Sequence, residues 1–258
     1  MSSDVGFVGL ALSTVMIAVA VGISLGQRLG LERSMLWASL RALVQLLVVG
    51  TALDLVIDPK RPLGLSWCWV VAMIVFAAFT TSRRAKEVPG AFGLSLAAYG
   101  AATAVTLAVI LGLGVFPTNG RTIVPLSGMV VGNSLSATVL VGRRIVAEFA
   151  DKRLEVEARL ALGRSNREAA APYLREAVRT ALIPQIETTK ATGIVFLPGA
   201  MVGLILAGVK PIDAVKVQGA VMFLILGAVA TTTSIIAIGL SRRLFTHDGR
   251  VVRLRRAA

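Results

Sequence analysis

The 258-residue sequence is poor in the residues from which disulfides, zinc sites and nucleic-acid platforms are built. Its single cysteine, Cys68, cannot form a disulfide within the chain, and we interpret it as a small buried or lipid-facing hydrophobe. Its single histidine, His247, argues against a histidine-rich zinc site. Only 5% of the residues are aromatic, and no basic domain with interleaved aromatics is present. The net charge of +13 therefore does not indicate nucleic-acid binding.

The sequence also lacks the motifs of an enzyme that works alone. It contains no G-x-x-x-x-G-K-[ST] phosphate loop, so we expect no ATP-binding cofactor site in this chain. It contains no HExxH or GxSxG motif either, which argues against an intramembrane enzyme. No carboxylate lies in the middle of an apolar run, and a proton-coupled carrier would normally need one there.

Long apolar runs are abundant. Hydrophobic residues make up 55% of the chain and the mean hydropathy is +0.79, which predicts an integral membrane protein. The first run follows Asp4 rather than a basic region, so we expect a span and not a cleaved signal peptide. The predicted fold is one all-α polytopic permease domain over 1–258 with about seven transmembrane helices, at 5–26, 35–57, 65–81, 92–116, 123–142, 191–209 and 217–240.

The basic residues predict the orientation of these spans. If the N-terminus is outside, the outer loops hold Lys60, Arg61, Arg121, Lys210 and Lys216, which are only five of the 27 basic residues. The reverse orientation would violate the positive-inside rule, so we expect the N-terminus outside and the C-terminus in the cytoplasm. The basic tail after Arg242 is also suited to touch anionic membrane lipids.

One sizeable hydrophilic segment, 143–190, interrupts the apolar runs and is predicted to be cytoplasmic. A first helix is expected over about 148–162, ended by Gly163. Ser165 and Glu168 fit a capping box that opens a second helix, which Pro184 is expected to end. The resulting elbow either docks a partner or lies as amphipathic helices on the membrane surface.

Polar residues inside spans are costly unless they face protein or a water-filled path, so they are candidates for a translocation pathway. Arg41 and Gln45 lie one turn apart in the second span, where Arg41 either snorkels to the interface or pairs with a carbonyl. In the fifth span Asn133 either packs against a neighbouring helix or lines the path, and Met129 offers a soft sulfur or simply apolar fill.

The sixth span carries "LPGAMVG", in which Pro198 and Gly199 interrupt the helix and Met201 follows. Broken helices of this kind either line transport sites or kink for packing. Gln218 adds a polar group at the start of the seventh span. Glu187 precedes the sixth span with Lys190 three residues later, so it either forms an ion pair or is a weak candidate metal ligand.

Five stretches together resemble one known family. In "EARLALG", Glu157, Ala158, Leu162 and Gly163 match the start of the EAA motif of ABC-transporter permeases, with Ser165 just beyond it. The other stretches are "SLRALVQLLVVG", "VPLSGMVVGNSLSATVL", "EAVRTALIP" and "TGIVFLPGAMVGLILAGVKPIDAVKVQ". Taken in their order along the chain, the five stretches resemble the FetB-type permeases, membrane subunits of bacterial iron-export ABC systems that are similar to plant aluminium-tolerance transporters. The resemblance includes Arg41 and Gln45, which implies a gating or structural role for them.

The resemblance implies a multi-pass bacterial plasma-membrane protein that exports iron or another metal. It further implies a cytoplasmic ATPase partner that docks on the elbow, and a homodimer of the permease. The alternative is an ATP-independent channel or secondary carrier for a cation or small solute, which the interrupted sixth span suits equally well.

Overall fold

The computed structural model describes residues 12, 14–58, 60–246 and 250–252, and within them the regular structure is helical. The chain forms two compact units, Met1–Arg61 and Pro62–Ala258, which we describe separately.

The first unit contains α2 (Val15–Gly26) and α3 (Glu32–Val56), which pack against each other. The turn between them places Arg28 and Gly30 at φ values of 53° and 68°. The Ser24 hydroxyl donates to Glu32 Oε1 at 2.6 Å and so ties the end of α2 to the start of α3. Of the predicted span 5–26, the part before α2 lies almost wholly outside the described residues.

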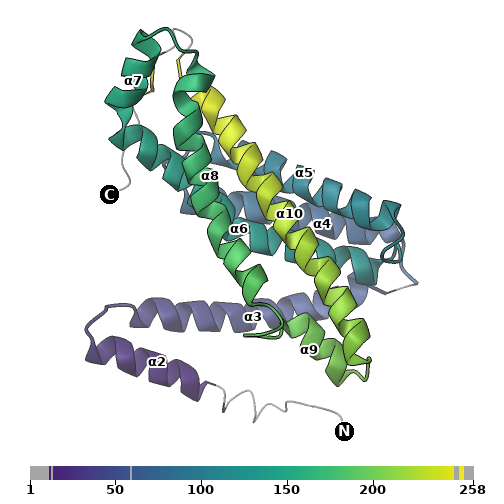
Figure 1. Ribbon diagram of the computed structural model, residues 1–258. Helices are drawn as coiled ribbons and strands as arrows, with labels where there is room; N and C mark the ends of the chain where they lie inside the picture. The colour runs from purple at the N-terminus through teal and green to yellow at the C-terminus, as the bar shows by residue number, and fades with distance from the viewer. Residues whose placement is uncertain (1–11, 13, 59, 247–249, 253–258) are drawn as a thin grey trace. The chain divides into compact units, whose positions relative to one another are not determined.

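The second unit is a bundle of α4 (Leu63–Arg84), α5 (Ala91–Gly112), α6 (Gly120–Asp151) and α10 (Pro211–Arg243). α10 packs against α5 and α6, and α4 packs against the same two helices (Figure 1). Many buried positions carry small side chains, such as Ala78, Ala98, Ala102 and Ala228. Small residues let helix backbones approach closely, which favours association inside a membrane.

Five helices of the described residues, α3, α4, α5, α6 and α10, are long and apolar enough to cross a membrane. They correspond to the predicted spans 35–57, 65–81, 92–116, 123–142 and 217–240. α6 and α10 have 32 and 33 residues, so each is roughly 50 Å long at 1.5 Å per residue. A hydrocarbon core is about 30 Å thick, so both helices extend well beyond it.

The predicted sixth span, 191–209, is not one continuous helix. α8 (Asn166–Ala191) ends where that span should begin, and residues 192–198 form an irregular segment in which Gly193 has a φ of 90°. α9 (Gly199–Leu206) then has eight residues, about 12 Å, and cannot cross the membrane alone. Pro198 lacks a backbone N–H and stands as the cap before α9, which separates the two helices.

The prediction that Pro184 ends the second cytoplasmic helix is wrong. α8 runs through both Pro172 and Pro184 as far as Ala191. A proline inside a helix removes one hydrogen bond, but α8 buries Ala177 and Ala181 in the main hydrophobic cluster of the unit. Packing of this face keeps the helix continuous despite both prolines.

Candidate functional site

The polar segment folds into a helical elbow, as predicted, with shifted boundaries. α6 continues to Asp151, and α7 (Arg153–Ala161) follows after a break at Lys152, so the first helix does not begin at residue 148. Gly163 ends α7 with a φ of 82°. Its N–H donates to Leu160 O at 2.9 Å, and the next N–H donates to Arg159 O at 3.2 Å. These two bonds form a Schellman motif, in which glycine is favoured.

Ser165 and Glu168 form the predicted capping box at the start of α8. The Glu168 N–H donates to Ser165 Oγ at 3.4 Å, and the Ser165 N–H donates to Glu168 Oε2 at 3.0 Å. The Ser165 hydroxyl also donates to the same carboxylate oxygen at 2.9 Å. The backbone and side-chain hydrogen bonds from Ser165 favour the charged form and lower the pKa of Glu168.

Replacing Ser165 by alanine is expected to raise the pKa of Glu168 toward its ordinary value of 4.5, because the hydroxyl donor is lost. The pKa of Glu168 is lower in the folded protein than its ordinary value. The hydrogen bonds from Ser165 to the Glu168 carboxylate therefore stabilise the fold above the ordinary pKa, and this stabilisation is lost as pH falls through the pKa of Glu168 in the folded protein. The lost cap should also reduce stability by about 1 kcal/mol. Titration of the glutamate carboxyl carbons by NMR checks this, with Ser165→Thr as the control. An unchanged Glu168 pKa in the alanine variant would contradict it.

Aromatic packing fixes the elbow to the bundle. The Phe149 ring, fully buried near the end of α6, packs edge-on against Tyr173 of α8, with ring centroids 6.0 Å apart. It packs in the same way against Phe245, just after α10, also at 6.0 Å. Val156 of α7 is fully buried in the same cluster. The elbow is therefore anchored to the ends of both long helices, at one end of the bundle (Figure 1).

Tyr173 also connects α8 to α7 through polar contacts. Its hydroxyl donates to Glu155 Oε2 at 3.0 Å, and the Arg159 guanidinium lies 5.7 Å from its ring centroid. Burial and the neighbouring Glu155 carboxylate raise the pKa of Tyr173. The phenol therefore stays protonated near neutral pH and keeps donating to Glu155.

One face of α7 carries apolar side chains that the described chain leaves uncovered. Leu154 and Leu162 are each 81% exposed, and Ala158, midway between them, is exposed as well. The spacing i, i+4, i+8 places the three residues on one side of the helix. We call Leu154, Ala158 and Leu162 the elbow face. Glu157, also predicted for the elbow, receives a hydrogen bond from Arg153 Nε at 2.7 Å.

The predicted pathway residues are distributed over both units of the chain. In α6 the Asn133 amide is exposed and donates to the Met129 backbone oxygen at 2.8 Å, while the Met129 side chain packs against the cluster of Val221 and Ile225 on α10. Arg41 and Gln45 lie one turn apart on α3, in the other unit.

The remaining pathway candidates lie on α9 and α10. Pro198 caps α9, Gly199 is its first residue, and Met201 is its buried residue. α9 packs against α10, which carries Gln218. The Gln218 side chain is buried, and its Oε1 accepts no hydrogen bond from the described residues.

Glu187 forms an ion pair with Lys190, whose Nζ lies 2.9 Å from Glu187 Oε1. Both side chains are largely exposed on α8. Among the residues that the structure describes, no group of three or more His, Cys, Asp or Glu side chains could hold a metal ion. The weak candidate ligand therefore stands alone in the described part of the chain.

Buried hydroxyl groups form a feature that sequence reasoning did not single out. Tyr99 of α5 and Thr81 of α4 share a hydrogen bond of 2.7 Å in the bundle interior. Five further buried hydroxyls on α5 and α6 have no hydrogen-bond partner in the described chain: Ser95, Thr103, Ser127, Ser134 and Thr138. The spacing of Ser95, Tyr99 and Thr103, at i, i+4 and i+8, is a signal that predicts one polar face of α5.

These features define an all-helical, multi-pass membrane protein whose bundle continues into a polar elbow. Sequence comparison agrees, because residues 7–245 match the family model described as "Uncharacterised protein family (UPF0014)". The chain belongs to this family.

Among curated proteins the chain is 37% identical over 237 residues to the "UPF0014 membrane protein STAR2" of rice, covering 90% of this chain and 81% of the relative. It is 34% identical over 243 residues to the "Probable iron export permease protein FetB" of Escherichia coli, covering 93% and 92%. It is 32% identical to the "Protein ALUMINUM SENSITIVE 3" of Arabidopsis thaliana, covering 89% and 84%. No solved structure gives a significant match. The predicted FetB-type relationship and membrane localisation are confirmed.

Proposed function

We propose that this chain is the membrane subunit of an ABC exporter that moves iron or another metal outward, with ATP hydrolysed on a separate cytoplasmic subunit. The elbow face carries this proposal. Two leucines that are each 81% exposed stand on a short polar helix at the end of the bundle, where an apolar face needs a partner. The name of the Escherichia coli relative supports iron and the outward direction.

The anchoring of the elbow suits a coupling role. α7 is joined to α6 through the chain at Lys152, so a force on α7 is transmitted to α6. The Phe149 ring of α6 contacts Tyr173 of α8 and Phe245 just after α10, so the force also reaches these two elements. Close-packed aromatic contacts resist deformation, so the elbow moves together with the long helices. ATP-driven closure of the ATPase subunits would then tilt these helices.

The charges in the second unit support a cytoplasmic position for the elbow. Arg143 and Arg242 lie toward the elbow ends of α6 and α10. The opposite ends carry fewer basic residues, among them Arg121 and Lys210. Under the positive-inside rule this difference supports a cytoplasmic elbow, in keeping with the proposed orientation in which the N-terminus is outside. A symmetric exporter of this kind uses two copies of the permease, each docking one ATPase.

The translocation path is assigned to the polar positions of α6, α9 and α10. Met129 and Gln218 offer a thioether and an amide oxygen on the side where α6 and α10 meet. Residues 192–198 are not helical, so their backbone carbonyls are not held in a regular helical hydrogen-bond pattern and are candidate ligands for a cation. Arg41 is assigned to gating or a structural role, since a cation in the path would repel a metal, and the neutral amides Gln45 and Asn133 are assigned to the path or to helix packing.

The alternative function is an ATP-independent channel or secondary carrier, which the interruption of 192–198 favours. Interrupted helices line ion sites in many secondary transporters. This alternative leaves the elbow face without a role.

The deciding experiment is ATP-dependent uptake of radioactive iron into inverted membrane vesicles that contain this protein and its candidate ATPase. Uptake that needs both subunits supports the exporter. Co-purification of the two subunits without iron uptake would retain the ABC assembly and remove iron as the substrate. Uptake by the permease alone, without ATP, would favour the channel or carrier.

A further inference from the structure

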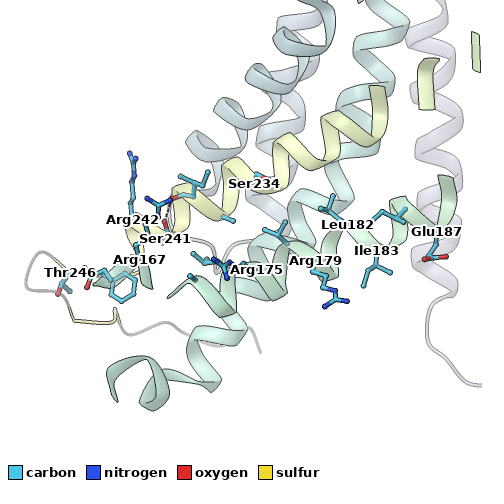
Figure 2. A pocket seen from close by; sticks show the side chains of 18 of the residues that line it. Arg167, Arg175, Arg179, Leu182, Ile183, Glu187, Ser234, Ser241, Arg242 and Thr246 are labelled. Carbon is cyan, nitrogen blue, oxygen red and sulfur yellow. Dashed lines mark hydrogen bonds between the residues drawn. The ribbon is translucent and has the colours of Figure 1, made fainter. Parts of the chain in front are cut away.

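A large groove runs between α8 and α10, with a volume of about 1420 Å³ (Figure 2). We call it the α8–α10 groove. Its walls are one side of α8, from Asn166 to Lys190, and the last part of α10 with the residues that follow, from Ser234 to Thr246. α10 is one of the helices long and apolar enough to cross a membrane, so the groove lies along the elbow end of a candidate span.

The groove carries strong positive charge without compensation. Its lining contains five basic side chains and one carboxylate, Glu187, which already pairs with Lys190. The other four basic residues have no acidic partner among the described residues: Arg167, Arg175, Arg179 and Arg242. Arg175 and Arg179 are four residues apart on α8, where like charges repel each other. An anion in the groove would relieve this repulsion.

The four arginines without an acidic partner lie from one end of the groove to its middle. Figure 2 shows Arg167 and Arg242 toward one end, Arg175 and Arg179 near the middle, and Leu182 and Ile183 toward the other end. Ile186 and Ile238 extend the apolar lining, and Ile238 is 58% exposed. The groove thus offers a cationic region followed by an apolar trough, as an anionic amphiphile requires.

We propose that the α8–α10 groove binds an anionic phospholipid. Its phosphate group would lie among the arginines at Arg175, Arg179 and Arg242, and an acyl chain would lie along Leu182 and Ile186. Guanidinium groups bind phosphate oxygens in pairs of hydrogen bonds, which favours arginine at such sites. Basic pockets between membrane helices bind anionic lipid headgroups in this way.

Charge argues against two protein occupants of the groove. A second copy that docked symmetrically through the same surface would place arginines against arginines, because a twofold interface uses one patch on both subunits. The chain's own C-terminal stretch "RVVRLRRAA" is basic and would meet the same repulsion. A phospholipid supplies the missing negative charge and fills the apolar trough.

The test is native mass spectrometry of the purified full-length protein with phosphatidylglycerol or phosphatidylcholine added. We expect wild-type protein to retain phosphatidylglycerol at least about tenfold better than phosphatidylcholine, and the double variant Arg175→Gln/Arg179→Gln to lose this preference. The control is Arg84→Gln/Lys86→Gln, which removes two exposed basic residues outside the groove and should keep the preference.

A second variant tests the trough. Ile186→Gln should weaken retention of long-chain phosphatidylglycerol and leave a short-chain form unaffected, because Ile186 lies about two helical turns beyond Arg179 on α8. The proposal is overturned if the arginine variant retains phosphatidylglycerol as wild type does, or if the control loses it equally. If the arginine variant instead loses the second copy of the chain or the ATPase while its lipid retention is unchanged, the groove binds protein and not lipid.

Discussion

Replacing Leu154 and Leu162 by glutamate is expected to abolish association between this chain and the ATPase subunit that we propose as its partner. Burying one leucine side chain contributes about 1.5–3 kcal/mol, and each 1.4 kcal/mol is a factor of ten in affinity. Loss of both contacts should weaken binding by roughly a hundredfold or more, and two buried carboxylates would add a desolvation cost. Co-purification of the tagged ATPase with each permease variant, followed by titration in detergent, measures the effect.

The fold should survive this double substitution, because both side chains are 81% exposed and only α7 is altered. Leu154→Met/Leu162→Met is the matched control, since methionine keeps the apolar area and the helix propensity. If the glutamate variant binds the ATPase with wild-type affinity, docking occurs elsewhere and the elbow face has another role.

Replacing Gly163 by valine is expected to reduce ATP-dependent transport at least about tenfold while leaving membrane insertion intact. Gly163 has a φ of 82°, which L-residues adopt at a cost of about 1–3 kcal/mol and β-branched residues least readily. A side chain at Gly163 would meet open space within the described chain, so the expected defect comes from the backbone. The turn at Gly163 would adopt another backbone conformation. This would shift the elbow face away from its docking position on the proposed ATPase.

Gly163→Asn is the control for this turn, because asparagine accepts the left-handed conformation far better than valine does. We expect the asparagine variant to transport at close to the wild-type rate in inverted vesicles, with equal amounts of each variant in the membrane. Equal transport by the valine variant would show that this turn does not couple the two subunits.

Local signals in the sequence predicted the elbow well. The Ser165–Glu168 capping box and the end of α7 at Gly163 depend on hydrogen bonds between residues a few positions apart, so the sequence alone is sufficient. Five long apolar runs became helices for the same reason, since hydropathy and helix length are properties of one segment.

Predictions that depended on tertiary packing were less successful. The predicted interruption at Pro198 and Gly199 is present in the predicted span 191–209, but the non-helical segment also extends back to residue 192. Pro184 was expected to end α8, but packing of Ala177 and Ala181 keeps the helix intact.

The surfaces around the elbow could not be predicted from the sequence. The exposure of Leu154 and Leu162 depends on how Phe149, Tyr173 and Phe245 orient α7, and these residues come from three separated segments. From the sequence, the arginines of α8 are interpreted only as basic residues of a cytoplasmic segment. The structure shows that they line the same groove as Arg242 of α10.

The unequal continuity of the helices has a mechanical consequence. α6 is one continuous helix from Gly120 to Asp151, so we expect it to move as a rigid body when the elbow moves. The connection from α8 to α9 contains seven irregular residues, so we expect the angle between these two helices to change more easily than the shape of α6. Spin labels at the ends of α6 should therefore keep a constant separation when ATP is added with the ATPase. Labels on either side of the connection from α8 to α9 should change theirs.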